Sequence, residues 1–237
     1  MLEIKDYASG SDGNCYLIYN NTTKILLECG VKKEKLITYL MGDGLTIAQL
    51  DGCLVSHYHN DHLESINYVK DYLDIYSNMQ VKEKYDYVKA IQPKKPTMIG
   101  NDIKVIPFNV EHGDCENYGY IIVDKDSMLL FATDCSLIEQ NLSNLPFDKI
   151  CIECNYDDEY LQRCLENPNE FNKYKYIRQC STHMSKKNCF EHLRHMNLSK
   201  CKEIVLLHHS KFLISKTKTE VECELTFGIK TRYAKEN

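Results

Sequence analysis

Residues 56–62 read Ser-His-Tyr-His-Asn-Asp-His and place four potential metal ligands, His57, His59, Asp61 and His62, within six residues. They directly follow the compact apolar run Gly52-Cys53-Leu54-Val55. The two histidines at alternate positions can face one cavity if this segment is extended. Imidazole and carboxylate groups are the donors that hold borderline divalent ions such as Zn²⁺. The stretch therefore predicts a metal site at the end of a strand.

Helical spacing of apolar residues continues after this stretch, with Leu63, Ile66, Val69 and Leu73 on one face. This pattern predicts a helix over residues 61–78, which would place Asp61 and His62 in its first turn. Upstream, two apolar runs at 14–19 and 24–29 are separated by the polar residues 20–23, which is typical of a hairpin.

The remaining chain alternates between the two kinds of pattern. Strands are expected at 103–108, 118–123, 128–132, 149–153 and 203–207, and helices at 33–41, 46–50, 157–166 and 185–196. This order suits an α+β architecture in which two sheets face each other and helices cover the outside.

Length and composition favour one large domain over residues 1–237. The chain is 43% hydrophobic, contains only 5 Pro and 10 Gly, and has no linker-like stretch. The net charge of −5 gives no general electrostatic reason for tight, non-specific nucleic-acid binding. The N-terminus lacks the apolar core of a signal peptide, and no long apolar run predicts a membrane span. We therefore expect a cytoplasmic location, in which the 12 Cys are reduced. The pair Cys151 and Cys154 is interpreted as part of a buried strand.

The segment from His57 to His62 closely resembles the signature of the metallo-β-lactamase superfamily. That resemblance implies a four-layer αββα sandwich and two divalent metal ions, zinc first and manganese as the alternative. It also implies further ligands at strand ends, namely His112, Asp134 and His208. His57, His59 and His112 would hold one ion, and Asp61, His62 and His208 the other, with Asp134 shared. A water between two such ions loses a proton readily and attacks phosphorus or carbonyl centres, and Asp61 could orient it.

Three other segments resemble the YycJ/WalJ-like branch of the superfamily: residues 8–16, 153–157 and 182–188, with the ending His208-His209-Ser210-Lys211. The branch implies phosphodiester chemistry in which His183 contacts the scissile phosphate or protonates the leaving oxygen. The alternative is that His183 merely caps the helix that begins near Ser185. Asn14, Asn155 and Tyr156 occupy motif positions that imply phosphate or base contacts, with turn formation as the equal alternative.

The chain departs from the branch at three positions, because Thr182 and Ser136 stand where Gly is usual and His209 replaces Leu. These changes concern the substrate pocket rather than the metal ligands. His209 should point opposite to His208 on a strand end, and its role is open. His192 and His195, one helical turn apart, are interpreted as surface residues of a helix.

Two substrates fit these motifs. The first is single-stranded nucleic acid, for which residues 174–178 with Lys186 and Lys187 could form a basic, aromatic groove. The second is a cyclic mononucleotide, because phage anti-Pycsar enzymes are similar in size and ligand pattern. Only 73 residues separate Asp134 from His208, too few for an inserted cap domain. A non-catalytic metal-binding scaffold and a thioester or lactam hydrolase are further alternatives, and similar phosphodiesterases make a homodimer a reasonable expectation.

Overall fold

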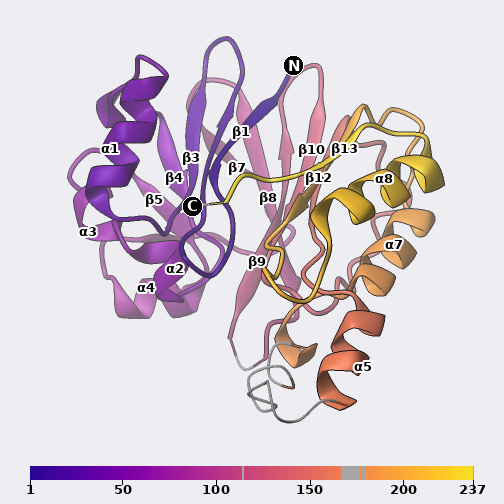
Figure 1. Cartoon of the computed structure of the whole chain (residues 1–237). Helices are drawn as coiled ribbons and strands as arrows, with labels where there is room; N and C mark the ends of the chain where they lie inside the picture. The colour runs from indigo at the N-terminus through magenta and orange to yellow at the C-terminus, as the bar shows by residue number, and fades with distance from the viewer. Residues whose placement is uncertain (114, 167–176, 178–179, 237) are drawn as a thin grey trace. The chain divides into compact units, whose positions relative to one another are not determined.

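The computed structural model describes residues 1–113, 115–166, 177 and 180–236. The chain divides into two compact units (Figure 1). Unit 1 comprises residues 1–108, 118–129 and 234–237, and unit 2 comprises residues 109–117 and 130–233. The assignment of one domain to residues 1–237 stays a prediction.

A six-stranded mixed sheet forms the centre of unit 1. Its strands follow the order β1 (Glu3–Ala8), β2 (Cys15–Tyr19), β3 (Lys24–Cys29), β4 (Gly52–Leu54), β5 (Ile75–Ser77) and β6 (Lys89–Ala90). β1, β2 and β3 are antiparallel neighbours, whereas β3 to β6 run parallel. The pairing of Tyr19 with Lys24 confirms the predicted hairpin. Because β3 and β4 are parallel, the residues that follow them emerge at the same edge of the sheet.

Short helices surround this sheet: α1 (Lys33–Gly42), the 3₁₀ turn η1 (Ile47–Gln49), α2 (Asn60–Leu63), α3 (Ile66–Val69) and α4 (Met79–Lys84). The single helix expected over 61–78 is wrong. Ser65 donates its backbone N–H to the carbonyl of Cys29, 2.9 Å away, which ends α2 after one turn. Ile75, Tyr76 and Ser77 then extend the sheet as β5, because a β-branched and an aromatic residue fit a strand better than a helix.

The second sheet has the strand order β13-β12-β11-β10-β9-β8-β7 and is also mixed. Its strands are β7 (Thr97–Ile99), β8 (Ile103–Val110), β9 (Asn117–Val123), β10 (Met128–Ala132), β11 (Lys149–Glu153), β12 (Glu203–Leu207) and β13 (Thr231–Tyr233). Within unit 1, β9 contacts the end of β4, since the Tyr120 hydroxyl donates to the Val55 carbonyl at 2.6 Å. The backbone N–H of Tyr118 likewise donates to the Ser56 carbonyl, 3.2 Å away.

Unit 2 places α5 (Asp158–Glu166), α7 (Lys186–His195) and α8 (Lys216–Phe227) around the parallel strands β11, β12 and β13 (Figure 1). α7 and α8 pack through Phe190 and Phe227, whose ring centroids lie 5.6 Å apart. The sequence patterns predicted α5, α7, β11 and β12, whereas α8 and β13 were not anticipated. Two mixed sheets flanked by helices confirm the expected fold class. Among the described residues, no helix combines the length and apolar character that a membrane span requires.

Candidate metal centre

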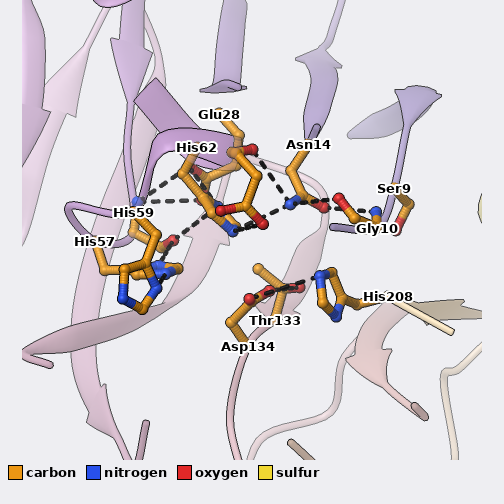
Figure 2. Close-up of polar contacts among 12 residues, drawn as sticks. Ser9, Gly10, Asn14, Glu28, His57, His59, His62, Thr133, Asp134 and His208 are labelled. Carbon is orange, nitrogen blue, oxygen red and sulfur yellow. Dashed lines mark hydrogen bonds and ion pairs between the residues drawn. The ribbon is translucent and has the colours of Figure 1, made fainter. Parts of the chain in front are cut away.

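In unit 1, the loop between β4 and α2 carries His57 and His59. Their rings meet edge to face, and Nε2 of His57 lies 2.9 Å from Nδ1 of His59 (Figure 2). Two nitrogens bonded to one tetrahedral zinc ion at 2.0–2.1 Å are separated by about 3.3 Å, close to this spacing. His59 has the extended backbone of a helix N-cap, so α2 begins immediately after it. The two ring nitrogens are thus close enough to serve as candidate ligands of one cation.

Asp61 and His62 lie in the single turn of α2. His62 is fully buried, whereas about a quarter of the Asp61 side chain is exposed. Nε2 of His62 lies 3.7 Å from Oδ2 of Asp61, so the two predicted ligands of the second ion are neighbours. This helix lies very close to the end of β3, because a Cβ atom at Gly30 would overlap the carbonyl group of Asp61. Glycine at position 30 thus permits the approach that positions Asp61 and His62.

Glu28 supports these histidines and is a residue that the sequence patterns did not reveal. Its side chain is fully buried, and its carboxylate accepts the Ser56 backbone N–H at 3.1 Å and lies 3.2 Å from Nδ1 of His62. A carboxylate at Nδ1 of a metal-binding histidine fixes the orientation of the ring. Glu28 adopts a left-handed backbone with φ of 62°, uncommon for a residue with a side chain.

Asn14, predicted to contact substrate, is fully buried and lies between His62 and Gly10 (Figure 2). Its amide nitrogen lies 3.0 Å from Nε2 of His62, and its Oδ1 accepts the Gly10 backbone N–H at 3.0 Å. Its own backbone N–H donates to the Asp61 carbonyl at 2.8 Å. These contacts match the turn-forming alternative, and a substrate role for Asn14 stays a prediction.

Unit 2 brings together His112, Asp134 and His183, whose potential ligand atoms lie within 4.8 Å of one another. Nδ1 of His112 lies 2.9 Å from the Thr182 carbonyl, so it donates there and leaves Nε2 as the ligand atom. Burial lowers the pKa of His112, despite the nearby Asp134 carboxylate that would raise it. A neutral imidazole is the form that binds metal.

His208 follows β12, and its Nε2 lies 3.6 Å from Oδ2 of Asp134 (Figure 2). Asp134 follows β10, and both residues have left-handed backbones, with φ of 50° and 52° respectively. Thr133 donates its hydroxyl to Oδ1 of Asp134 at 2.9 Å, which orients the carboxylate. Three of the predicted ligands, His112, Asp134 and His208, thus lie in one part of unit 2.

Glu153 is the second supporting residue. It begins the motif at 153–157, but the sequence analysis assigned it no role of its own. Its buried carboxylate lies 2.7 Å from Nδ1 of His183 and 3.3 Å from Nδ1 of His208. Burial alone would raise the pKa of Glu153, but the two histidines, His183 foremost, hold that pKa below its ordinary value. The sequence contains a signal for both glutamates, since residues 24–29 read KILLEC and residues 149–154 read KICIEC. In each, the glutamate ends an apolar strand beside a histidine-bearing loop.

Asn155 and Tyr156 have structural contacts in unit 2. The Asn155 amide donates to the His208 carbonyl and lies 3.1 Å from Nδ1 of that ring. Tyr156 is buried against Leu213, and its carbonyl accepts the Lys186 N–H at 2.7 Å. A substrate role for either residue stays a prediction.

Other candidates lie apart from these ligands. His209 packs its ring against Tyr233, with 5.3 Å between centroids, whereas His208 lies beside Asp134. His195 is exposed and contacts Glu191, while the His192 side chain lines a cavity with residues 138–143. Most of the proposed groove, residues 174–176 and 178, lies outside the described residues. The Lys186 ammonium contacts the carboxylates of Asp157 and Glu222.

A family model described as the β-lactamase superfamily domain matches residues 23–209. The chain belongs to the metallo-β-lactamase superfamily. Its sequence is 25% identical over 227 residues to exodeoxyribonuclease WalJ of Streptococcus pneumoniae, covering 81% of this chain and 84% of that protein. Exodeoxyribonuclease YycJ of Bacillus anthracis is 24% identical over 167 residues, covering 65% of this chain and 63% of that protein.

Solved structures share the fold. The metallo-β-lactamase fold protein YhfI from Bacillus subtilis superposes with a TM-score of 0.75 and 18% identity, covering 100% of this chain and 97% of the other. Zinc-bound PqqB from Methylobacterium extorquens superposes with a TM-score of 0.70 and 11% identity, covering 100% of this chain and 98% of the other. Together with the clustered histidines and aspartates, superfamily membership identifies the chain as a metallo-β-lactamase-fold hydrolase with candidate metal ligands in both units.

Proposed function

We propose that this protein is a dinuclear metal-dependent phosphodiesterase that hydrolyses single-stranded nucleic acid from an end. The observation that carries the proposal is the contact between His183 and the buried Glu153, at 2.7 Å. The carboxylate keeps a proton on Nδ1, so the proton that Nε2 can donate is the second proton of the imidazolium form. Expulsion of an alkoxide from a phosphodiester benefits from such a donor.

In this proposal, His57, His59, His112, Asp61, His62, Asp134 and His208 hold two divalent ions, zinc or manganese. The ions would lower the pKa of a bound water so that it attacks phosphorus. Asp61, partly exposed, accepts a hydrogen bond from the attacking group and orients it. His183 gives its proton to the leaving oxygen, and the negative charge of Glu153 stabilises the protonated ring before transfer.

The relatives point to the substrate. Two of the relatives are named as exodeoxyribonucleases. WalJ matches 81% of this chain and YycJ matches 65% of it. A linear single strand with a free end is therefore the first substrate to offer. A circular strand and cyclic mononucleotides serve as the comparison substrates. An exonuclease does not cleave a circular strand, and an enzyme specific for small nucleotides does not cleave the polymer.

The test combines metal analysis with these substrates. We expect about two Zn²⁺ or Mn²⁺ per chain and release of mononucleotides from the linear strand alone. Asp61→Ala and His208→Ala should abolish turnover, whereas His183→Ala should keep its metals and lose most of its activity. His195→Ala is the matched control, since His195 is exposed and contacts Glu191 within its own helix. A metal-loaded protein that cleaves none of these phosphodiesters would overturn the proposal in favour of a scaffold.

A further inference from the structure

A series of neighbouring tyrosine rings and lysine ammonium groups extends across unit 1, starting beside a predicted metal ligand. The Tyr58 ring lies 5.0 Å from the His59 ring, measured between centroids. Nζ of Lys84 lies over Tyr58 at 5.6 Å and over Tyr85 at 5.5 Å. One lysine thus bridges the ligand loop and the end of α4.

The series continues away from the ligands. The Tyr85 and Tyr87 rings lie 5.8 Å apart, and Nζ of Lys70 lies over Tyr87 at 4.9 Å. We call Tyr58, Lys84, Tyr85, Tyr87 and Lys70 the tyrosine–lysine track. Its residues come from three separate segments of chain, so the arrangement is a product of the fold rather than of one repetitive stretch.

The core of unit 1 holds the track in place. Tyr58, Tyr85 and Tyr87 are half-buried and pack one side against that core, while Lys70 and Lys84 are exposed. α4, which carries Lys84, is tied to the ligand loop because its N-cap Asn78 donates to the Ser56 carbonyl at 3.0 Å. Rigid rings lose little conformational freedom when a flat ligand stacks on them.

The chemistry of the track fits a chain of unpaired bases. Single-stranded nucleic acid is bound where aromatic side chains stack on bases and cations follow the phosphates. A duplex hides its base faces in the helical stack, and a cyclic mononucleotide has only one base for several rings. Glu83 and Asp86 lie next to the track in sequence, so charge alone gives weak attraction and stacking must contribute most of the affinity.

We propose that the tyrosine–lysine track binds several nucleotides of a single strand and leads that strand to His59 and the metal centre. This inference rests on the proposed phosphodiesterase function. Lysines that cover the rings in the free protein would move to the phosphates as bases take their place, because surface cation–π contacts are weak. The tyrosine–lysine track therefore favours a polymeric substrate over a small nucleotide.

The test compares an oligonucleotide of eight nucleotides with a dinucleotide. Tyr85→Ala should raise KM for the longer substrate by roughly 5- to 100-fold and leave the dinucleotide unchanged. Tyr85→Phe keeps the ring and should behave as the unaltered protein. Lys84→Ala should reduce the slope of log affinity against log salt by about 0.7, the value for one phosphate contact on a single strand.

Lys33→Ala is the matched control for Lys84→Ala. Nζ of Lys33 lies over the Tyr68 ring at 4.7 Å, a similar geometry outside the track. The proposal would be overturned if both lysine variants changed the salt dependence of affinity equally. It would also be overturned if Tyr85→Ala folded and kept an unchanged KM for the longer substrate. An unaltered protein that cleaves neither substrate would instead contradict the phosphodiesterase function, so the two failures are distinguishable.

Discussion

Nδ1 of His183 lies 2.7 Å from Oε1 of Glu153, and the same carboxylate oxygen lies 3.3 Å from Nδ1 of His208. One buried anion therefore orients both a predicted proton donor and a predicted metal ligand. In the proposed mechanism, a single side chain thus supports both the proton donor and the metal site.

The first expectation concerns this carboxylate. His183→Ala should lower kcat by about 10²- to 10⁴-fold, the usual contribution of a general acid, while the metal content stays at that of the unaltered protein. Glu153→Gln should lower both kcat and metal affinity because it also releases His208. Steady-state kinetics and elemental analysis of the same samples measure both effects. Metal loss in His183→Ala would make His183 a ligand instead.

A second expectation concerns Glu28, the corresponding buried anion of unit 1. Glu28→Gln preserves volume but removes the charge 3.2 Å from Nδ1 of His62. Loss of such a supporting partner usually weakens metal binding by about 10- to 100-fold. Competition with a chelator of known affinity measures the change. Glu64→Gln, an exposed position just after α2, serves as control and should bind metal normally.

The close approach at Gly30 predicts a loss of stability on adding one methyl group. Gly30→Ala would drive Cβ into the Asp61 carbonyl, so β3 or α2 must shift. Overpacking of this kind costs about 1–3 kcal/mol in the free energy of unfolding. Gly42→Ala is the matched control, because a Cβ there meets nothing within 4 Å. Thermal unfolding should show a lower Tm for the first variant and an unchanged or higher Tm for the second.

The contact of Lys186 with Asp157, at 2.5 Å, makes stability depend on pH. Burial would raise the pKa of Asp157, but Lys186 and the Glu159 backbone N–H hold that pKa below its usual range. A lowered carboxyl pKa contributes stability above the unfolded value of about 3.9, and this stability is lost as pH falls through the folded pKa. Lys186, whose pKa is raised by the same contact, stays charged throughout this window.

Asp157→Asn should therefore reduce the free energy of unfolding by about 1–3 kcal/mol at pH 7 and by progressively less below pH 4. Urea denaturation at several pH values measures the difference. Asp126→Asn, at an exposed turn position, should show little difference at pH 7. If the free energy of unfolding of Asp157→Asn stayed equally far below that of the unaltered protein in strong acid, the contact with Lys186 would not contribute through its charge.

The sequence was most informative where chemistry is local. His57, His59, Asp61 and His62 are neighbours in the chain, so their spacing alone predicted a cluster of ligands. The structure places the first two between β4 and α2 and the other two within α2. Glu28 and Glu153 were missed because each lies in an apolar run, where a single acidic residue resembles a tolerated exception. Their roles depend on partners from other segments, such as Ser56 and His183.

The wrong helix over 61–78 has a similar cause. The apolar spacing was real, since Leu63, Ile66, Val69 and Leu73 are all buried. A helix and a broken chain with a strand can bury the same positions, and the choice was made by the bond from Ser65 to Cys29. A contact between residues 36 positions apart is invisible to any local pattern.

Three residues at strand ends, Glu28, Asp134 and His208, adopt φ values of 62°, 50° and 52°. A left-handed backbone costs a residue with a side chain about 1–2 kcal/mol, and glycine or asparagine would relieve it. Relieving this cost by substitution would at the same time remove a carboxylate or imidazole that the proposed metal centre uses. Stability and the proposed function are therefore opposed at these three positions.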